Sequence, residues 1–486
     1  MGSIMLTYDL KKTREPLYLA LYNAIKSDIL NGTLAGGEKI PSKRQMAINN
    51  GVSVITVENA YELLLSEGYI SSKPKSGFYV CDISNDVVLG TSGFLQGKPQ
   101  ISEETKNNGL KTKLTIDFSN NQTPSDLFPF DNWLRATRKV FSEKRQVLLE
   151  NSPSQGVVSL RRSIARYLKE YRGLKVEESS IVIGAGSEYL YGLLVQLIGR
   201  DVVYGIENPG YSKQEKIYKA QGVKVDYLAI DDNGVKAREV ENKDIGVLHI
   251  TPSHQYPTGK IMPISRRYEL LAWASAVEGR YIVEDDYDSE LRLDGKPIPS
   301  FKSIDEAGCV IYLNTFSKAL CSTVRISYMV LPPLLCKRFN EKLSFYSCTV
   351  STFEQYTLQE FMDSGKMGSH INRLRTYYRK KRDAFIKAIK ASSLCPFVEI
   401  SGEKAGLFFL MKLSCSRDEN TIVKLAEEQG LGLCTLSSFY REDSGSRFES
   451  NDCKNVFIMN YATLDMDKID EIVEKLCLCM LGVGTK

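Results

Sequence analysis

The sequence predicts an α/β protein made of a small N-terminal winged helix-turn-helix and a large domain with a mixed, mostly parallel sheet. Residues 1–82 hold three segments with helical apolar spacing, followed by two short β-prone runs. Residues 83–113 lose that periodicity and are rich in Ser, Asn, Gly, Thr and Lys, which is typical of a surface linker. In residues 114–486, apolar β-branched runs alternate with helical segments, as in buried parallel sheets.

The first two helices of the N-terminal part are predicted from apolar spacing and from a capping pattern. Leu21, Ile25 and Ile29 recur every four residues and form one buried stripe. Ser42 opens the second helix and has capping-box spacing to Gln45, so each side chain is expected to satisfy a backbone N–H group. These segments predict the first two helices of the module.

A third helix and a hairpin complete this module. Ser53 can cap the helix, and Gly68 ends it. Its inward positions are predicted to be Val57, Ala60, Tyr61, Leu64 and Leu65. Two β-prone runs, 69–70 and 78–80, then bracket a turn that contains Pro74 and Gly77.

The large domain is predicted from five buried strands. The apolar runs that predict them are 180–183, 202–206, 245–250, 281–283 and 310–313. They are separated by segments long enough for crossover helices, which is why the sheet is expected to be mostly parallel.

Composition excludes several classes of protein. A chain of 486 residues with 43% hydrophobic and 25% charged residues is long enough for two or three buried cores. It contains neither a secretory leader nor an apolar run of about 18 residues, so we expect a cytoplasmic protein without a membrane partner. The eleven cysteines are scattered without paired spacing, and the chain has only three histidines. The sequence therefore predicts neither disulfides nor a metal site.

Charge gives weak information about a nucleic-acid partner. The net charge is +4, and residues 1–82 carry seven Lys and two Arg against three Asp and five Glu, a balance of +1. Non-specific binding to a polyanion is therefore expected to be modest. Any DNA recognition must come from local residues.

The segments 16–18, 40–44, 51–53, 56–57 and 77–78 together resemble the GntR-type winged helix. The resemblance implies that the third helix enters the major groove of a double-stranded DNA operator. The residues it places at DNA are Ser42, Arg44, Ser53, Thr56, Lys73 and Lys75. Val54 stands where family members often have an arginine, so one contact is expected to be missing. The alternative is a protein-docking module in which Ser42 only caps its own helix.

In the C-terminal domain, the segments 283–290, 315–318 and 251–259, with Arg325, resemble the fold-type I aminotransferases in their MocR regulator form. The resemblance runs from about Leu114 to the C-terminus. It implies pyridoxal 5′-phosphate as cofactor, held by Lys318 in an internal aldimine. Asp285, 33 residues before that lysine, would face the pyridine nitrogen, because the ring withdraws electrons well only when this nitrogen is protonated.

The remaining cofactor contacts also follow from the resemblance. Tyr287 would form a hydrogen bond with the cofactor O3′, and Tyr211 would stack on the pyridine ring. His254 and Gln255 are expected nearby. The phosphate would be held by the helix start and by hydroxyls and a guanidinium, namely at Gly186, Ser187, Glu188, Thr315, Ser317 and Arg325. Singly, each of these residues is more often a loop, surface or core residue, and the alternative is a domain that kept the fold and lost the cofactor.

A late strand, 457–462, bears on function. Ile458 takes the place at which aminotransferases usually hold the substrate α-carboxylate with an arginine. We therefore predict no catalytic residues, and a homodimeric transcriptional regulator that senses pyridoxal phosphate or a small amino compound, with Arg447 as a candidate anchor for such a compound. The alternative is a working aminotransferase with an appended DNA-binding module.

Overall fold

The computed structural model describes residues 6–10, 15–74, 76–82, 114, 116–119, 124–295, 299–441 and 453–482. The chain divides into two compact units, residues 1–110 and 111–486, and each is treated by itself. The predicted linker 83–113, Lys75 and Arg447 lie outside the described residues.

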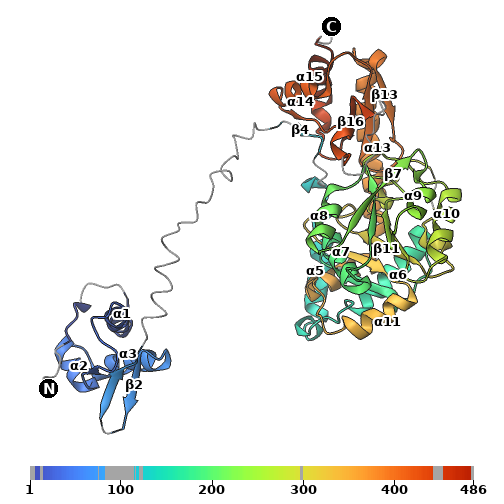
Figure 1. Ribbon diagram of the computed structural model, residues 1–486. Helices are drawn as coiled ribbons and strands as arrows, with labels where there is room; N and C mark the ends of the chain where they lie inside the picture. The colour runs from blue at the N-terminus through green and yellow to red at the C-terminus, as the bar shows by residue number, and fades with distance from the viewer. Residues whose placement is uncertain are drawn as a thin grey trace. The chain divides into compact units, whose positions relative to one another are not determined.

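The N-terminal unit is a winged helix-turn-helix (Figure 1). Its helices are α1 (Leu17–Leu30), α2 (Lys43–Asn50) and α3 (Val54–Ser66). The hairpin consists of β2 (Ile70–Lys73) and β3 (Gly77–Val80), and β1 (Lys39–Ile40) adds a third antiparallel strand beside β3. Strand β1 was not predicted from the sequence, because two residues are too few to show a period of two.

The capping predictions for α2 and α3 are confirmed in part. Ser42 accepts a hydrogen bond from the Gln45 backbone N–H at 3.3 Å, and Ser53 accepts one from Thr56 at 3.1 Å. The reciprocal half of the capping box is absent, because the Gln45 side chain donates to Asn49 instead. Both helix starts are therefore fixed by a single hydroxyl.

The C-terminal unit is built on an eight-stranded sheet with the order β5-β12-β11-β10-β9-β6-β7-β8. All five predicted runs form strands of this sheet. The strands are β5 (Ile181–Gly184), β6 (Tyr204–Asn208), β7 (Val225–Asp231), β8 (Gly234–Val235), β9 (Val247–Ile250), β10 (Tyr281–Asp285), β11 (Val310–Thr315) and β12 (Ser327–Val330). β12 is antiparallel to β5 and β11, and β8 is antiparallel to β7, while the other neighbouring pairs are parallel.

Helices cover both faces of this sheet. One face packs against α7 (Ser187–Ile198), α8 (Ser212–Ala220) and α11 (Pro333–Lys342). The other packs against α6 (Val158–Arg172), α9 (Ala237–Glu241), α10 (Ile264–Ser275) and α12 (Thr352–Asp363), and α5 (Phe130–Glu143) lies against α12. Along β10, Tyr281 and Val283 face the α7 side, whereas Ile282 faces the α10 side. This alternation decides which way the next carboxylates point.

A smaller antiparallel sheet with the order β13-β14-β16 completes the unit. It consists of β13 (Val398–Ser401), β14 (Phe408–Leu413) and β16 (Val456–Asn460), with β15 (Leu431–Gly432) paired to β4 (Ile116–Asp117) nearby. Its helices are α13 (Lys366–Ala391), α14 (Glu419–Glu428) and α15 (Ile469–Leu481), whose Cys477 and Cys479 are buried.

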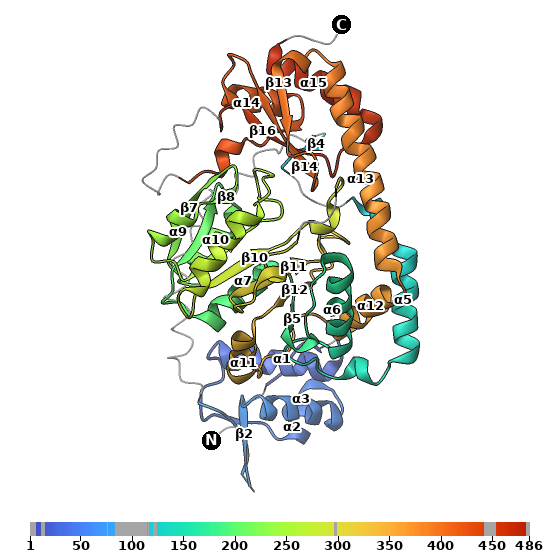
Figure 2. The same cartoon turned by 90° about the vertical axis from the view of Figure 1, so that its right-hand side faces the viewer.

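The long helix α13 belongs to two cores. In Figure 2 it runs from beside α5 and α12 up to the β13–β14–β16 sheet. Met367 and Ile371 pack in the core with α6 and α12, while Leu374, Phe385 and Ile389 pack in the core of the smaller sheet. None of the described helices has the length and apolar composition needed to cross a bilayer.

Candidate functional site

The predicted cofactor residues gather around the carboxyl end of β10. Asp285 is the last residue of that strand, and by strand alternation it faces α7. The Tyr191 hydroxyl on α7 donates to Asp285 Oδ2 at 2.5 Å. Burial, followed by the Asp285 charge, raises the pKa of Tyr191, so this phenol stays protonated and remains a donor.

A histidine lies close to the same carboxylate oxygen. His249 Nε2 lies 3.5 Å from Asp285 Oδ2, and its Nδ1 lies 2.7 Å from the Tyr218 hydroxyl. The other oxygen, Asp285 Oδ1, is buried and has no hydrogen-bond partner among the described residues. A buried carboxylate oxygen without a donor is costly. This oxygen is therefore suited to accept a hydrogen bond from a donor group of a ligand.

Lys318 follows β11 in a turn and is largely shielded from solvent. Burial lowers the pKa of its amine to about 8, and the charge of Asp288 opposes this shift. Near neutral pH, a lysine with this pKa has a much larger neutral fraction than an ordinary one. The neutral amine is the form that attacks a carbonyl group.

The start of α7 forms a tight cradle with Arg325. Gly186 has a φ of 93° and caps the helix, as predicted for the strand–turn–helix at this position. A Cβ atom added there would lie 2.5 Å from Arg325 Nη2, so only glycine lets this guanidinium approach. Backbone N–H groups at a helix start, next to a guanidinium, form a site for an anion.

The Glu188 side chain is unsuited to the phosphate contact that was predicted for this residue. Its carboxylate lies 3.5 Å from Arg325 and 3.3 Å from Lys213. A carboxylate repels a phosphate, so this residue could contribute to phosphate binding only through its backbone N–H group. The Ser187 backbone N–H has the same location in the first turn of α7.

Three hydroxyls form a chain beside Lys318. Thr315 donates to Ser317 at 2.9 Å, and Ser327 donates to Thr315 at 2.8 Å. Thr315 and Ser317 were predicted from the sequence, but Ser327 was not, because that residue comes from the antiparallel neighbour strand β12. The fold brings it directly opposite Thr315.

The two predicted tyrosines lie near this group of residues. Tyr211 precedes α8, remains 38% exposed, and meets Tyr256 edge-to-face with ring centroids 6.1 Å apart. The Tyr287 hydroxyl donates to the His254 carbonyl at 3.1 Å, and His254 Nδ1 lies 2.7 Å from Asp288 Oδ2. Gln255, also expected nearby, donates instead to the carbonyls of Pro209 and Tyr256.

A second buried polar cluster lies on the other face of the sheet. Asp286 points away from Asp285 and forms an ion pair with Arg172 at 2.9 Å, with both side chains almost fully buried. The Tyr312 hydroxyl also donates to Asp286 at 2.6 Å. The pair of Arg172 and Asp286 was not predicted, because its members are far apart in the chain and follow no local pattern.

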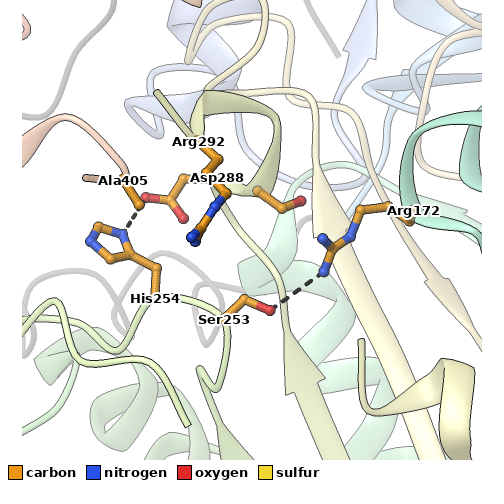
Figure 3. Close-up of a pocket in the computed structure, with 7 residues that line it drawn as sticks. Arg172, Ser253, His254, Asp288, Arg292 and Ala405 are labelled. Atoms are coloured by element: carbon orange, nitrogen blue, oxygen red, sulfur yellow. Dashed lines mark hydrogen bonds and ion pairs between the residues drawn. The ribbon is translucent and has the colours of Figure 1, made fainter. Parts of the chain in front are cut away.

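A pocket connects this cluster to His254 and Asp288 (Figure 3). Its lining consists of Arg172, Ser253, His254, Asp288, Ser289, Arg292 and Ala405. In Figure 3 the Arg292 side chain lies between the His254–Asp288 pair and Arg172. Neither of the two arginines that line this pocket was among the predicted cofactor contacts.

Ile458 lies in β16, opposite Leu410 of β14, and is only 3% exposed. It packs in a small apolar cluster with Phe408, Leu410, Leu436 and Val456, against which Tyr256 also packs. The position therefore offers apolar contact and no hydrogen-bond donor to a carboxylate.

The predicted DNA residues are mostly exposed. Arg44 on α2 and Lys73 on β2 face solvent, and the Lys73 amine lies 4.6 Å from the centre of the Tyr79 ring. The Ser53 and Thr56 hydroxyls bond each other at 2.8 Å at the start of α3. Val54, in place of the expected arginine, is 43% exposed at the same helix start.

Comparison with protein families matches both units. Residues 17–80 match the family of bacterial regulatory proteins of the gntR type, and residues 113–476 match aminotransferase class I and II. A gntR-type DNA-binding module joined to an aminotransferase domain defines the class. The chain belongs to the MocR-type transcriptional regulators, which have this architecture.

Full-length relatives share the architecture. The chain is 34% identical to the uncharacterized HTH-type transcriptional regulator YdeL of Bacillus subtilis, over 95% of this chain and 96% of that protein. It is 27% identical to the probable rhizopine catabolism regulatory protein MocR of Rhizobium meliloti, covering 96% and 94%. It is 28% identical to the pyridoxine biosynthesis regulator PdxR of Corynebacterium glutamicum, covering 86% and 88%.

The C-terminal unit also resembles solved enzymes. The α-aminoadipate aminotransferase LysN of Thermus thermophilus, solved with N-(5′-phosphopyridoxyl)-L-leucine, is 25% identical with a TM-score of 0.63. The match covers 81% of this chain and 98% of LysN. The aminotransferase fold is thus common to this regulator and to working enzymes.

Proposed function

We propose that this protein is a transcriptional regulator that holds pyridoxal phosphate on Lys318 and changes its operator binding with cofactor or amino-compound occupancy. The observation that carries the proposal is the buried Asp285 carboxylate. The Tyr191 hydroxyl donates to one of its oxygens, from which His249 Nε2 lies 3.5 Å away, and the other oxygen has no partner among the described residues. A protonated pyridine nitrogen would supply the missing donor.

The other residues of the site fit the same cofactor. The lowered pKa of Lys318 suits an amine that attacks an aldehyde. The space that Gly186 leaves beside Arg325, with the hydroxyls of Thr315 and Ser317, suits a phosphate. Tyr211 would stack on the ring, and the Tyr287 hydroxyl would remain near its O3′. When bound, the cofactor would supply an electrophilic aldehyde and an electron-withdrawing ring.

Ile458 favours regulation over transamination. A substrate α-carboxylate that met this apolar cluster would lose its water without gaining a donor. The alternative of a working aminotransferase needs a carboxylate anchor at this position, and Ile458 provides none. We therefore propose that the domain detects a small molecule and assign no catalytic residue.

DNA contact is proposed through the N-terminal unit. The exposed Arg44 and Lys73 side chains are free to reach phosphates or base edges, and Ser42, Ser53 and Thr56 present hydroxyls at the starts of α2 and α3. Lys75 belongs to the same wing in the sequence. Because residues 1–82 have a charge balance of only +1, a second copy of the module would be needed for tight operator binding.

A homodimer would supply that second copy. Large apolar side chains on α5 and α12 remain exposed, among them Phe130 at 66%, Leu134 at 48% and Phe141 at 47%. The Phe141 ring also contacts the ring of the half-exposed Phe353 of α12 in a tilted arrangement, with centroids 5.2 Å apart, which connects the two helices in this patch. A contiguous apolar surface of this kind indicates a protein–protein interface, and we propose a second copy of this chain as its partner.

The proposal is tested by a DNA-binding titration of the full chain with and without pyridoxal phosphate. Operator affinity is expected to change on cofactor addition in the wild type and to stay constant in Lys318→Ala. A matched surface control, Lys337→Ala on α11, should behave as the wild type. An identical titration for the wild type in both conditions, with the cofactor shown to be bound, would contradict cofactor sensing.

A further inference from the structure

The pocket of Figure 3 contains a cation that the protein itself does not neutralise. The Arg292 guanidinium makes neither a hydrogen bond nor an ion pair with any residue that the structure describes, and its Nε atom is buried. The nearby carboxylate of Asp294 is engaged by Arg382 at 2.5 Å and by Arg379 at 3.5 Å. A shielded charge without a partner is costly, so this pocket is electrostatically incomplete.

A second arginine, which is itself paired with a carboxylate, lines the same pocket. Arg172 lines the same pocket with its guanidinium 2.9 Å from Asp286 and 3.4 Å from the Ser253 hydroxyl. The Asp288 carboxylate at the pocket edge is held by His254 at 2.7 Å. Burial, and then the charge of Arg172, lowers the pKa of Arg292, while Asp294 opposes this shift. An added anion would relieve the repulsion between the two arginines.

The pocket also offers neutral donors and little space. The Ser289 hydroxyl is buried without a partner among the described residues, and the Ser253 hydroxyl lies within reach of Arg172. The enclosed space is about 10 Å³, which is room for about one water molecule, and the pocket is partly open to solvent. A planar carboxylate fits these donors, because a guanidinium can bind both of its oxygens at once.

Two lining residues connect this pocket with the proposed cofactor site. The His254 carbonyl accepts a hydrogen bond from the Tyr287 hydroxyl at 3.1 Å. The negative charge of Asp288 favours the protonated form of the Lys318 amine. We infer that Arg292, assisted by Arg172, binds the carboxylate of a small amino compound whose amine reaches the Lys318 side. This inference rests on the proposed sensing function. It places the anchor away from Ile458, where aminotransferases usually have theirs.

The main test uses probes that differ only in the carboxylate. The cofactor-loaded full chain is titrated with β-alanine and with ethylamine, and with 4-aminobutanoate and propylamine, while the cofactor absorbance is recorded. The wild type is expected to prefer the carboxylated probe of at least one pair by about tenfold or more. Arg292→Gln should reduce that preference to within about twofold and leave the binding of the plain amine unchanged.

Two further variants separate a binding role from a structural one. Arg292→Lys keeps the positive charge but loses the planar guanidinium that can bind both carboxylate oxygens at once. An intermediate preference for the carboxylated probe is therefore expected. Arg162→Gln, which removes an arginine paired with Glu178 on the surface of α6, should behave as the wild type. If Arg292→Gln keeps the full preference, or if the wild type shows none, the inference is wrong.

A second arm needs no cofactor and so distinguishes this inference from the proposed function. The cofactor-free full chain is unfolded by heat in sodium acetate and in sodium chloride at equal ionic strength. Acetate is expected to raise the Tm of the wild type, and of Arg292→Gln much less, because a ligand stabilises the state it binds. Equal effects in both proteins would overturn the subsite. Failure of the wild type to bind pyridoxal phosphate would instead contradict the proposed function.

Discussion

Two places in the C-terminal unit, the end of β10 and the middle of β16, differ in what they leave unsatisfied. At the end of β10, Asp285 is buried with one oxygen held by Tyr191 and the other without a partner among the described residues. In β16, Ile458 is equally buried but lies entirely among apolar side chains. The first arrangement is costly unless a ligand completes it, and the second needs none. The contrast supports a domain that keeps a cofactor site and lacks a substrate anchor in this strand.

The largest expected effect tests the β10 side of the comparison. Lys318→Ala should lose the visible absorbance of cofactor-loaded protein completely, because no amine remains to attach the aldehyde. Borohydride treatment followed by mass spectrometry should find added mass on the wild-type peptide containing residue 318 and none in the variant. Persistent labelling of the variant would show that another residue holds the cofactor.

The β16 side is tested by restoring the arginine. Ile458→Arg should lower the free energy of unfolding by about 3 kcal/mol, since the cluster offers no anion to pair with a buried guanidinium. Thermal unfolding of the full chain measures this, with Ile458→Val as the mild control at about 1 kcal/mol. A stable variant that gains transaminase activity would show that only one residue separates the regulator from an enzyme.

A charge change at Asp285 tests the carboxylate itself. Asp285→Asn keeps the shape and can still bond Tyr191, but it cannot pair with a protonated pyridine nitrogen. Cofactor affinity should fall roughly tenfold to a hundredfold, the loss expected for one charge-assisted hydrogen bond. Equilibrium titration with pyridoxal phosphate gives the ratio. Unchanged affinity would mean that the open oxygen is satisfied by something else.

The N-terminal unit should respond independently. Arg44→Ala is expected to weaken operator binding by about tenfold at fixed salt, as for the loss of one phosphate or base contact. Cofactor binding should stay at the wild-type level. Gel-shift titrations at several salt concentrations also show whether the contact is to phosphate, because the salt slope then decreases by about one. An effect on the cofactor would argue against separate roles.

The smallest effect is a pH dependence. Because burial lowers the pKa of Lys318 from 10.5 to about 8, the reactive neutral amine is already plentiful about two to three pH units below the range of an ordinary lysine. The rate of cofactor attachment should rise with pH up to about 8 and then level off. Stopped-flow absorbance between pH 6.5 and 9.5 measures the profile. A rate still rising at pH 9.5 would contradict the lowered pKa.

Local patterns in the sequence predicted much of the fold. Apolar runs were sufficient for the five main strands, because strands buried on both faces are apolar throughout. Capping hydroxyls were sufficient for the starts of α2 and α3. The short strand β1 escaped, since its pairing with β3 depends on a partner nearly forty residues away in the sequence.

The candidate site was predicted only where a family pattern covers it. Asp285 and Lys318 come from recognisable segments, whereas His249 and Tyr191 reach Asp285 only through the packing of β9 and α7. Arg292 was not predicted from the sequence for the same reason. Its significance lies in the absence of a partner among the described residues, and no spacing of residues along the chain reveals such an absence.

The helix α13 has a consequence for how the large unit loses its structure. Met367 and Ile371 are part of one apolar core, and Leu374, Phe385 and Ile389 are part of another. Because both cores depend on one continuous helix, neither can melt while the other retains all of its contacts. Residues 111–486 should therefore unfold as a single cooperative unit, with amide hydrogens at both ends of α13 exchanging together.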